Sequence, residues 1–94
     1  MKLRPEEHLL RGIWTYKAGT MQVDDTCRRI EWLVETQLRQ VASSTVFGDW
    51  ETLFQDPADG RYWERTYPQG EMQGGGPPQL QVLSEVEARS KYGI

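Results

Sequence analysis

Residues 50–78 have the sequence WETLFQDPADGRYWERTYPQGEMQGGGPP. Two aromatic-rich runs, Trp50–Gln55 and Arg61–Tyr67, flank the turn-forming residues DPADG. Pro57 presets φ, the aspartate side chains can cap the turn, and Gly60 tolerates a positive φ. This pattern predicts a β-hairpin. Its register stays open at this point, because a one-residue bulge at Gly60 would change which aromatic side chains face each other.

A glycine–proline segment, Gly74 to Pro78, follows the hairpin. Three residues without a Cβ and two without a backbone N–H cannot order themselves, so the neighbouring sheet would have to hold the segment. A phosphate-binding loop is disfavoured, because no Lys-Ser/Thr pair follows and no helix is predicted to start there. We expect instead that the glycines let the backbone pass close to a neighbouring aromatic side chain or strand.

Upstream of the hairpin, the clearest pattern predicts a helix from Asp25 to about Val41. Its apolar residues recur at helical spacing, and Asp24 and Asp25 are candidate N-caps. The apolar stripe consists of Cys27, Ile30, Leu33, Val34, Leu38 and Val41. Residues 42–48 are rich in turn formers and predict a connection to the hairpin. A helix with a single apolar stripe implies a sheet that the stripe covers.

An earlier hairpin is predicted from the runs Gly12–Tyr16 and Thr20–Val23. Its aromatic and β-branched residues favour strands, and Gly19 can take the left-handed conformation that a short loop needs. Residues 4–10 predict a short helical turn, with Pro5 at a first-turn position. The chain before the long helix is therefore expected to contribute one turn and two strands.

The C-terminal part predicts a strand at Gln79–Leu83 and then a short helix at about residues 85–92. Ser84 and Glu87 have the spacing of a capping box, which favours a helix start at this point. The element order is therefore ββαβββα within a single domain, residues 1–94. We expect an α+β fold with a mainly antiparallel sheet of about five strands and the helices on one face of it.

The composition is that of an ordinary globular domain, with 37% hydrophobic and 27% charged residues. A net charge of −3 disfavours direct binding to nucleic acid or to an anionic membrane, and it suits a basic protein partner better. The single cysteine, Cys27, excludes an intrachain disulfide and a cysteine-cluster metal site. The N-terminal residues lack the apolar run of a signal peptide or membrane span, so we expect a cytoplasmic protein.

No catalytic, cofactor-binding or metal-binding residue is predicted. His8 is the sole histidine and lacks an orienting partner at a recognisable spacing, and Cys27 is expected to pack as a small hydrophobe. Four carboxylates lie close in sequence: Asp56, Asp59, Glu64 and Glu71. Turn chemistry explains the aspartates, and pairing with neighbouring arginines explains Glu64. A small hydrolase that uses this cluster is the third alternative for function.

Several motifs form a distinctive combination: DPxDGRxWE at residues 56–64, Tyr67-Pro68, and GGGPP at residues 74–78, with CRRIEWLVETQL upstream and SEVEARSKYG near the end. With this combination the chain resembles the immunity protein 27 family of bacterial polymorphic toxin systems. The resemblance extends over nearly the whole chain, from about Leu10 to Gly93. It implies a cytoplasmic protein, encoded beside a toxin, that neutralises the toxin by binding and catalyses no reaction.

The resemblance names a toxin as partner but not the residues that contact it. Because the surface is acidic, we expect the toxin domain to be basic. The candidate contact residues are charged side chains on or near the predicted hairpin: Asp56, Asp59, Arg61, Glu64, Arg65 and Glu71. The second alternative is a small protein-interaction or regulatory module, without catalytic activity, that binds no toxin.

Overall fold

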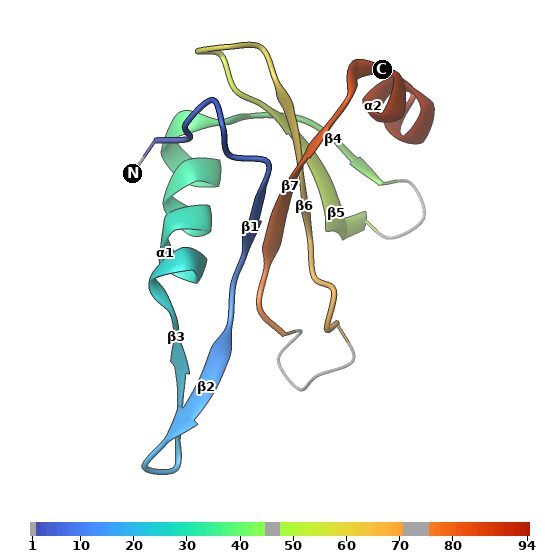
Figure 1. Ribbon diagram of the computed structural model, residues 1–94. Helices are drawn as coiled ribbons and strands as arrows, with labels where there is room; N and C mark the ends of the chain where they lie inside the picture. The colour runs from blue at the N-terminus through green and yellow to red at the C-terminus, as the bar shows by residue number, and fades with distance from the viewer. Residues whose placement is uncertain (1, 45–47, 71–75) are drawn as a thin grey trace.

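The hairpin predicted around residues 50–67 forms the middle of a five-stranded antiparallel sheet in the computed structural model, which describes residues 2–44, 48–70 and 76–94. The order across the sheet is β1 (Leu9–Arg11), β7 (Gln79–Leu83), β6 (Tyr62–Thr66), β5 (Gly48–Gln55) and β4 (Arg39–Ser44). Two helices and a separate two-stranded sheet complete the structure (Figure 1). The α+β fold predicted from the sequence is confirmed.

The register of the β5–β6 hairpin, which the sequence left open, places Phe54 opposite Trp63 and Leu53 opposite Glu64. Gly60 has a φ of +80° in the connecting loop, as the turn prediction required. Residues that face each other directly lie on the same side of a sheet. Phe54 and Trp63 therefore share one face, while Leu53 and Glu64 share the other.

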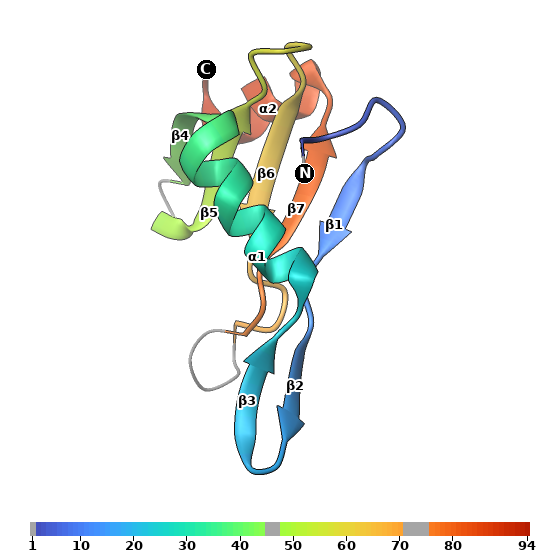
Figure 2. The same cartoon turned by 90° about the vertical axis from the view of Figure 1, so that its left-hand side faces the viewer.

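The first helix, α1 (Asp25–Trp32), begins as predicted. The carboxylate of Asp24 caps it by accepting a hydrogen bond from the Cys27 N–H at 2.8 Å. Its apolar stripe packs against the sheet, as Figure 2 shows with α1 crossing in front of the strands. The buried core between the two consists of Leu10, Ile30, Leu33, Leu38, Phe54, Trp63 and Leu80.

The prediction that this helix continues to about Val41 is wrong. The chain makes one π-helical turn, η1 (Leu33–Gln37), and the Leu38 N–H donates to the Leu33 carbonyl at 2.8 Å. Leu38 itself is extended, with φ −102° and ψ 147°, and β4 starts at the next residue. Leu38 is buried under both interpretations, so apolar spacing alone could not distinguish the end of a helix from the entry into a strand.

The connection predicted at residues 42–48 is also partly wrong, because β4 extends through Ser44 and pairs with β5. Ala42 lies opposite Leu53, and Ser43 lies opposite Thr52. This segment becomes a strand because it forms hydrogen bonds with β5. The turn propensity of the segment itself gives no information about that partner. Residues 45–47 of the predicted connection lie outside the described residues.

Residues 4–10, predicted as a short helical turn, form a tight turn followed by β1. The Glu7 N–H donates to the Arg4 carbonyl at 3.0 Å around the turn, and Leu10 then lies opposite Leu80 of β7. A helix this short has few internal hydrogen bonds. Pairing with the edge of β7 satisfies the backbone and buries Leu10, so the strand prevails over the local preference.

The early hairpin forms at β2 (Trp14–Lys17) and β3 (Thr20–Val23), but outside the main sheet. We call residues 14–23 the arm. Its turn residues, Ala18 and Gly19, have φ values of +53° and +79°, the signs of a type I′ turn, which matches the strand twist. Figure 1 shows the arm projecting beyond the end of α1 and away from the five strands. The molecule is consequently elongated, measuring 44 × 30 × 19 Å along its principal axes.

The C-terminal helix, α2 (Glu85–Tyr92), has the predicted capping box, with Ser84 and Glu87 each bonding the other's backbone N–H. The expectation that both helices cover one face of the sheet is wrong. Figures 1 and 2 show α1 and α2 on opposite sides of it. The physical reason is that Leu53 and Glu64, which point away from α1, are also buried and need a cover on their own face.

One glycine of the glycine–proline segment is described. Gly76 has a φ of +74°, and a Cβ at this position would collide with the backbone of Gln69. The segment is then held by the Gly12 N–H, which donates to the Pro78 carbonyl at 2.9 Å. A close backbone approach thus exists at Gly76, but to the turn at Gln69 and not to an aromatic side chain or strand as predicted, and Gly74 and Gly75 lie outside the described residues.

Candidate functional site

The arm has one apolar and one polar face. Its register pairs Trp14 with Val23 and Tyr16 with Met21, so these four side chains form what we call the apolar arm face. The alternating positions carry the polar residues Thr15, Lys17, Thr20 and Gln22. Tyr16 is 74% exposed and Val23 is also exposed, while Trp14 and Met21 are half-buried. Alternation of apolar and polar residues normally packs the apolar face of a strand on a core. In the arm, side chains of that face are open to solvent.

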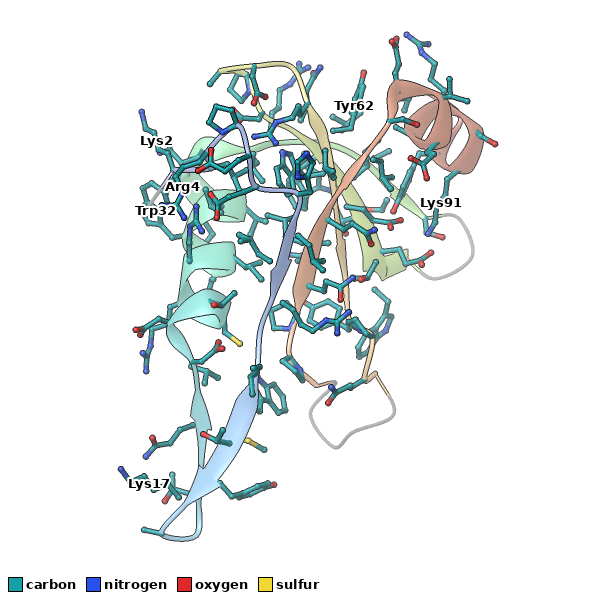
Figure 3. All side chains as sticks on the ribbon, viewed as in Figure 1. Lys2, Arg4, Lys17, Trp32, Tyr62 and Lys91 are labelled. Carbon is teal, nitrogen blue, oxygen red and sulfur yellow. The ribbon has the colours of Figure 1, made fainter. Side chains whose placement is uncertain are left out.

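An uncovered apolar face distinguishes the arm from the rest of the molecule. An isolated two-stranded hairpin is only marginally stable in water, because it has nothing against which to bury its apolar side chains. Ile13, directly before the arm, is also exposed, at 55%. Figure 3 shows Lys17 near the outer end of the arm, at the opposite end of the molecule from Tyr62. Exposed apolar side chains gathered on one face are typical of a protein-interaction site.

A groove of about 370 Å³, which we call the arm groove, lies at the base of the arm. Its lining residues are Trp14, Val23, Cys27, Arg28, Ile30, Glu31, Val34, Glu35, Arg65, Tyr67, Gly76 and Pro78. The guanidinium of Arg65 lies over the ring of Phe54, at 5.5 Å from the centroid, and over that of Tyr67 at 5.8 Å. The apolar arm face is therefore continuous with a partly apolar groove with a few charged residues.

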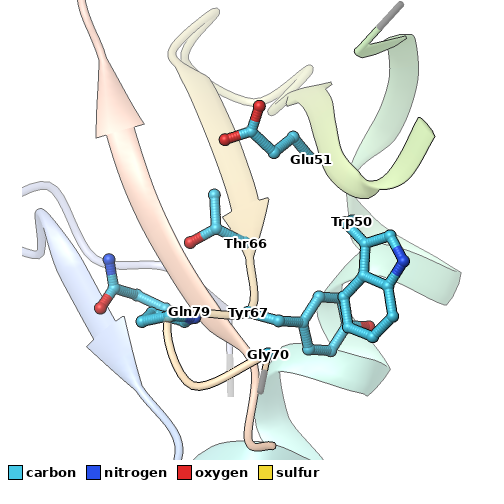
Figure 4. Close-up of a pocket in the computed structure, with 7 residues that line it drawn as sticks. Trp50, Glu51, Thr66, Tyr67, Gly70 and Gln79 are labelled. Carbon is cyan, nitrogen blue, oxygen red and sulfur yellow. The ribbon is translucent and has the colours of Figure 1, made fainter. Parts of the chain in front are cut away.

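A second, more open groove of about 550 Å³ lies at the same end of the sheet; we call it the Trp50 pocket. It is lined by Trp50, Glu51, Thr66, Tyr67, Pro68, Gly70 and Gln79. Trp50 is 51% exposed and packs edge-on against Tyr67, with ring centroids 5.3 Å apart and an interplanar angle of 80°. Figure 4 shows the two rings side by side, with Glu51 and Thr66 on the adjacent strands. Because Tyr67 lines both grooves, the arm groove and the Trp50 pocket share a wall.

Glu64, one of the predicted contact residues, lies under α2. Its carboxylate accepts hydrogen bonds from the Tyr92 hydroxyl and the Lys91 ammonium, both at 2.7 Å, and Lys91 also reaches Glu51 at 2.9 Å. Burial, together with the Glu64 carboxylate, raises the pKa of the Tyr92 hydroxyl. Burial lowers the pKa of Lys91, but its hydrogen bonds to Glu64 and Glu51 outweigh burial and raise it. These contacts dock α2 on the sheet.

Asp56, Asp59 and Arg61 lie together in the β5–β6 loop, at the end of the sheet opposite the arm (Figure 1). Arg61 donates from Nη1 to the Glu7 carbonyl at 2.7 Å and from Nε to Asp59 at 2.6 Å. Burial raises the pKa of Asp59, but hydrogen bonds from the backbone and side chain of Arg61 outweigh it, and the net shift is downward. Asp56 accepts the Ala58 N–H at 2.9 Å within the turn. This group ties the N-terminal segment to the loop.

The structure therefore brings together three of the predicted contact residues and separates the others. Glu64 faces α2, while Arg65 lies on the α1 face in the arm groove. Glu71 lies outside the described residues. Each of the five described side chains has a contact inside the protein, and whether any of them also contacts a partner stays a prediction.

Neither the arm nor the Trp50 pocket was predicted from the sequence to be functional. For the arm a signal existed, because apolar residues alternate with polar ones in both WTYK and TMQV and coincide on one face once the two runs pair. Trp50 and Glu51 stand at the head of the central hairpin, where an aromatic residue is equally typical of core packing. Their position at an open sheet end depends on tertiary structure.

Cys27 and His8, the residues considered for catalysis, take part in the packing and backbone hydrogen bonding of the fold. Cys27 is buried, and burial followed by the nearby Asp24 raises its pKa, which agrees with packing as a small hydrophobe. The backbone carbonyl of His8 accepts the Val82 N–H at 2.9 Å. Across residues 2–44, 48–70 and 76–94, no cluster of three His, Cys, Asp or Glu side chains could hold a metal ion. None of the helices in this part of the chain is long and apolar enough to cross a membrane.

Comparison with known proteins adds one finding. A model of the family described as immunity protein 27 matches residues 16–84, well over half of the chain. The chain belongs to the immunity protein 27 family. The match starts inside the arm and ends at the cap of α2, so it includes the central hairpin and β7. The resemblance inferred from the motifs is thereby confirmed. No curated protein and no solved structure matches this immunity-family chain.

Proposed function

We propose that this protein neutralises a cognate toxin by binding it stoichiometrically, without turnover, and that the toxin covers the apolar arm face. Family membership supports the immunity role. The observation that carries the binding surface is the arm itself, whose Tyr16 and Val23 stay exposed although the alternating pattern is that of a buried strand. A partner that packs on this face would supply the burial that a lone hairpin lacks.

The apolar arm face and the two grooves beside it contain the residue types found at the centre of protein interfaces. A stable complex buries about 1,200–2,000 Å² in total, and its energetic centre is usually built from Trp, Tyr and Arg. Trp14 and Arg65 line the arm groove, Tyr16 lies on the same arm face as Trp14, and Tyr67 connects this groove to the Trp50 pocket. One end of the elongated molecule thus concentrates the residue types that anchor interfaces.

Charge supports a basic toxin. The chain has a net charge of −3, so a basic partner would be attracted over a distance of about one Debye length, and capture would be faster at low salt. We place the encounter in the cytoplasm, whose reducing conditions suit the one free thiol, Cys27.

The test is co-expression with the toxin domain encoded by the gene beside this one. We expect cells that express the toxin domain alone to die and cells that also express this protein to grow. The purified pair should form a complex of fixed stoichiometry in size-exclusion chromatography. Continued killing despite soluble, folded protein, with no complex in vitro, would contradict the proposal.

A variant separates binding from other routes to rescue. Tyr16→Ser together with Val23→Thr removes apolar surface from the arm and leaves the five-stranded sheet untouched. We expect this double variant to fold, to bind weakly and to protect poorly. The matched control is Thr15→Ala with Gln22→Ala on the polar face of the same strands, which should protect as the wild type does.

A further inference from the structure

We infer that the Trp50 pocket receives a lysine or arginine side chain of the toxin, an inference that rests on the function proposed above. The pocket is open, has a volume of about 550 Å³ and lies beside the arm groove, with Tyr67 in the wall of both. A toxin seated on the arm would therefore meet this pocket along the same surface.

The aromatic side chains of the pocket suit a cation. Trp50 is half exposed and contacts Tyr67 edge to face, so much of its indole surface remains open to the pocket. Tryptophan is the side chain whose ring face attracts cations most strongly, at distances up to about 6 Å from the ring centroid. The methylene groups of a lysine or arginine would also bury apolar area against Trp50 and Pro68.

The charge balance beside these rings favours a cation as well. Glu51 and Glu64 have two carboxylates, and the single ammonium of Lys91 bridges them at 2.9 and 2.7 Å. Lys91 donates to Oε2 of Glu51, whereas Oε1 is buried and has no hydrogen-bond partner within the described residues. A buried acceptor without a donor is costly, by about 1–3 kcal/mol. Among the described residues, Oε1 of Glu51 is thus an acceptor left unused beside the pocket.

Among the described residues, no lysine or arginine lines the pocket itself, although Lys91 bonds Glu51 and Arg65 lies over the Tyr67 ring. Glu51 is the charged residue of the lining, and the others are Trp50, Thr66, Tyr67, Pro68, Gly70 and Gln79. Arg11 is not part of this lining, and its Nε donates to the Gln79 side-chain oxygen at 2.9 Å. The Glu51 carboxylate would repel an acidic side chain in the pocket, and an apolar side chain would gain nothing from it.

The experiment measures binding of the toxin domain encoded by the neighbouring gene to wild type, Glu51→Gln, Trp50→Ala and Glu85→Gln. Glu85 is the control, because it is an exposed glutamate of α2 that pairs with Arg89 away from the pocket. We expect Glu51→Gln and Trp50→Ala to raise Kd by about 10- to 100-fold, the range of an interface anchor, and Glu85→Gln to leave it unchanged. A single cooperative thermal unfolding transition in each variant would show that it is folded. If wild type binds the toxin and both pocket variants bind equally well, the inference is overturned and the proposed function stands.

A probe without the toxin keeps the inference testable if wild type fails to bind it. Titration with Nα-acetyl-lysine methylamide and Nα-acetyl-arginine methylamide should shift the indole N–H resonance of Trp50, which Trp50→Phe assigns. The shift should be smaller in Glu51→Gln, and neutral Nα-acetyl-norleucine methylamide should produce less of it. Equal shifts with the neutral and the basic compounds, or none with either, would overturn the inference.

Discussion

The protein contains two antiparallel hairpins that share a sequence pattern and differ in their surroundings. The central β5–β6 hairpin is covered on both faces, by α1 and by α2, and its Trp63 is 0% exposed. The arm belongs to no larger sheet, and its Tyr16 is 74% exposed. Alternation of apolar and polar residues predicts which side chains share a face, but not whether anything packs on that face.

The two hairpins also differ in whether their side chains are already bonded inside the protein or are exposed to a partner. On the central hairpin, Arg61 ties down the N-terminal segment and Glu64 docks α2, so their charges are already used inside the protein. On the arm, Trp14, Tyr16 and Val23 are at least partly open to solvent. We therefore expect variants of the central hairpin to change stability and variants of the arm to change binding.

The largest expected effect is on the central hairpin. Trp63→Ala should lower the free energy of unfolding by about 3–5 kcal/mol, because it removes a fully buried aromatic ring and leaves a cavity. Chemical denaturation followed by far-UV circular dichroism measures this change. Trp50→Ala is the matched control, since Trp50 is half exposed, and it should cost about 1 kcal/mol or less. Equal losses in the two variants would contradict the assignment of Trp63 to the buried core and of Trp50 to the open end of the same hairpin.

The next effect is on the arm and appears in binding. Tyr16→Ser should weaken toxin binding by about 2 kcal/mol or more, as expected for an aromatic anchor at the centre of an interface. It should change the free energy of unfolding by less than about 0.5 kcal/mol, because Tyr16 is exposed in the free protein. Isothermal titration calorimetry and denaturation on the same samples give both numbers. A variant that loses stability while it keeps its affinity would reverse the roles of the two hairpins.

A third effect concerns stability at acid pH, which depends on the part of the protein outside the arm. A bidentate hydrogen bond from Arg29 lowers the pKa of Glu7 from 4.5 to about 2. Because the folded pKa lies below the unfolded one, this stabilisation is complete above about pH 4.5 and is lost as the pH falls toward 2.

Glu7→Gln should therefore cost about 1–2 kcal/mol at neutral pH and flatten the stability profile between about pH 5 and 2. The arm sequence WTYKAGTMQV contains no Asp or Glu, so arm variants should leave this profile unchanged. Thermal unfolding measured across the pH range tests both expectations. A profile for Glu7→Gln as steep as that of wild type would show that another carboxylate is responsible.

The smallest effect is at the tip of the arm. Ala18 has a φ of +53°, a conformation that favours Asn or Gly in type I′ turns, so Ala18→Asn should stabilise the arm by about 0.5 kcal/mol. Gly19→Ala, at a φ of +79°, should destabilise it by about 1 kcal/mol through backbone strain alone, because no atom lies within 4 Å of the added Cβ. The changes should appear in the hydrogen-exchange rates of the arm amides and not in global unfolding, since the arm makes few contacts with the five-stranded sheet and the helices. The same sign for both variants would contradict this assignment of the turn.

Local signals in the sequence predicted much of the fold. The DPADG turn, the Asp24 cap and the Ser84–Glu87 capping box are each formed by residues a few positions apart, and each is present in the structure. Strands β1 and β4 were missed because their hydrogen-bond partners, β7 and β5, are distant in sequence or lie beyond a turn-rich segment. The placement of α2 on the second face depends on the burial of Leu53 and Glu64, which only the sheet register reveals.

The candidate site was less predictable than the fold. Charged residues of the β5–β6 loop looked available because turns are usually exposed, yet Arg61 and Asp59 bond to each other and Arg61 to the N-terminal segment. The arm looked like two ordinary strands of a sheet, because propensity cannot show that a sheet excludes them. Its exposure is a property of the whole molecule, and it became evident only from the assembled structure.

Hydrogen–deuterium exchange of the free protein and of its complex with the toxin domain encoded beside it tests the account most directly. We predict that amides of residues 14–23 exchange fast in the free protein and become protected in the complex, together with those near Trp50 and Tyr67. Protection confined to the loop at residues 56–61, with the arm unchanged by the toxin, would contradict the assignment of the arm as the binding surface.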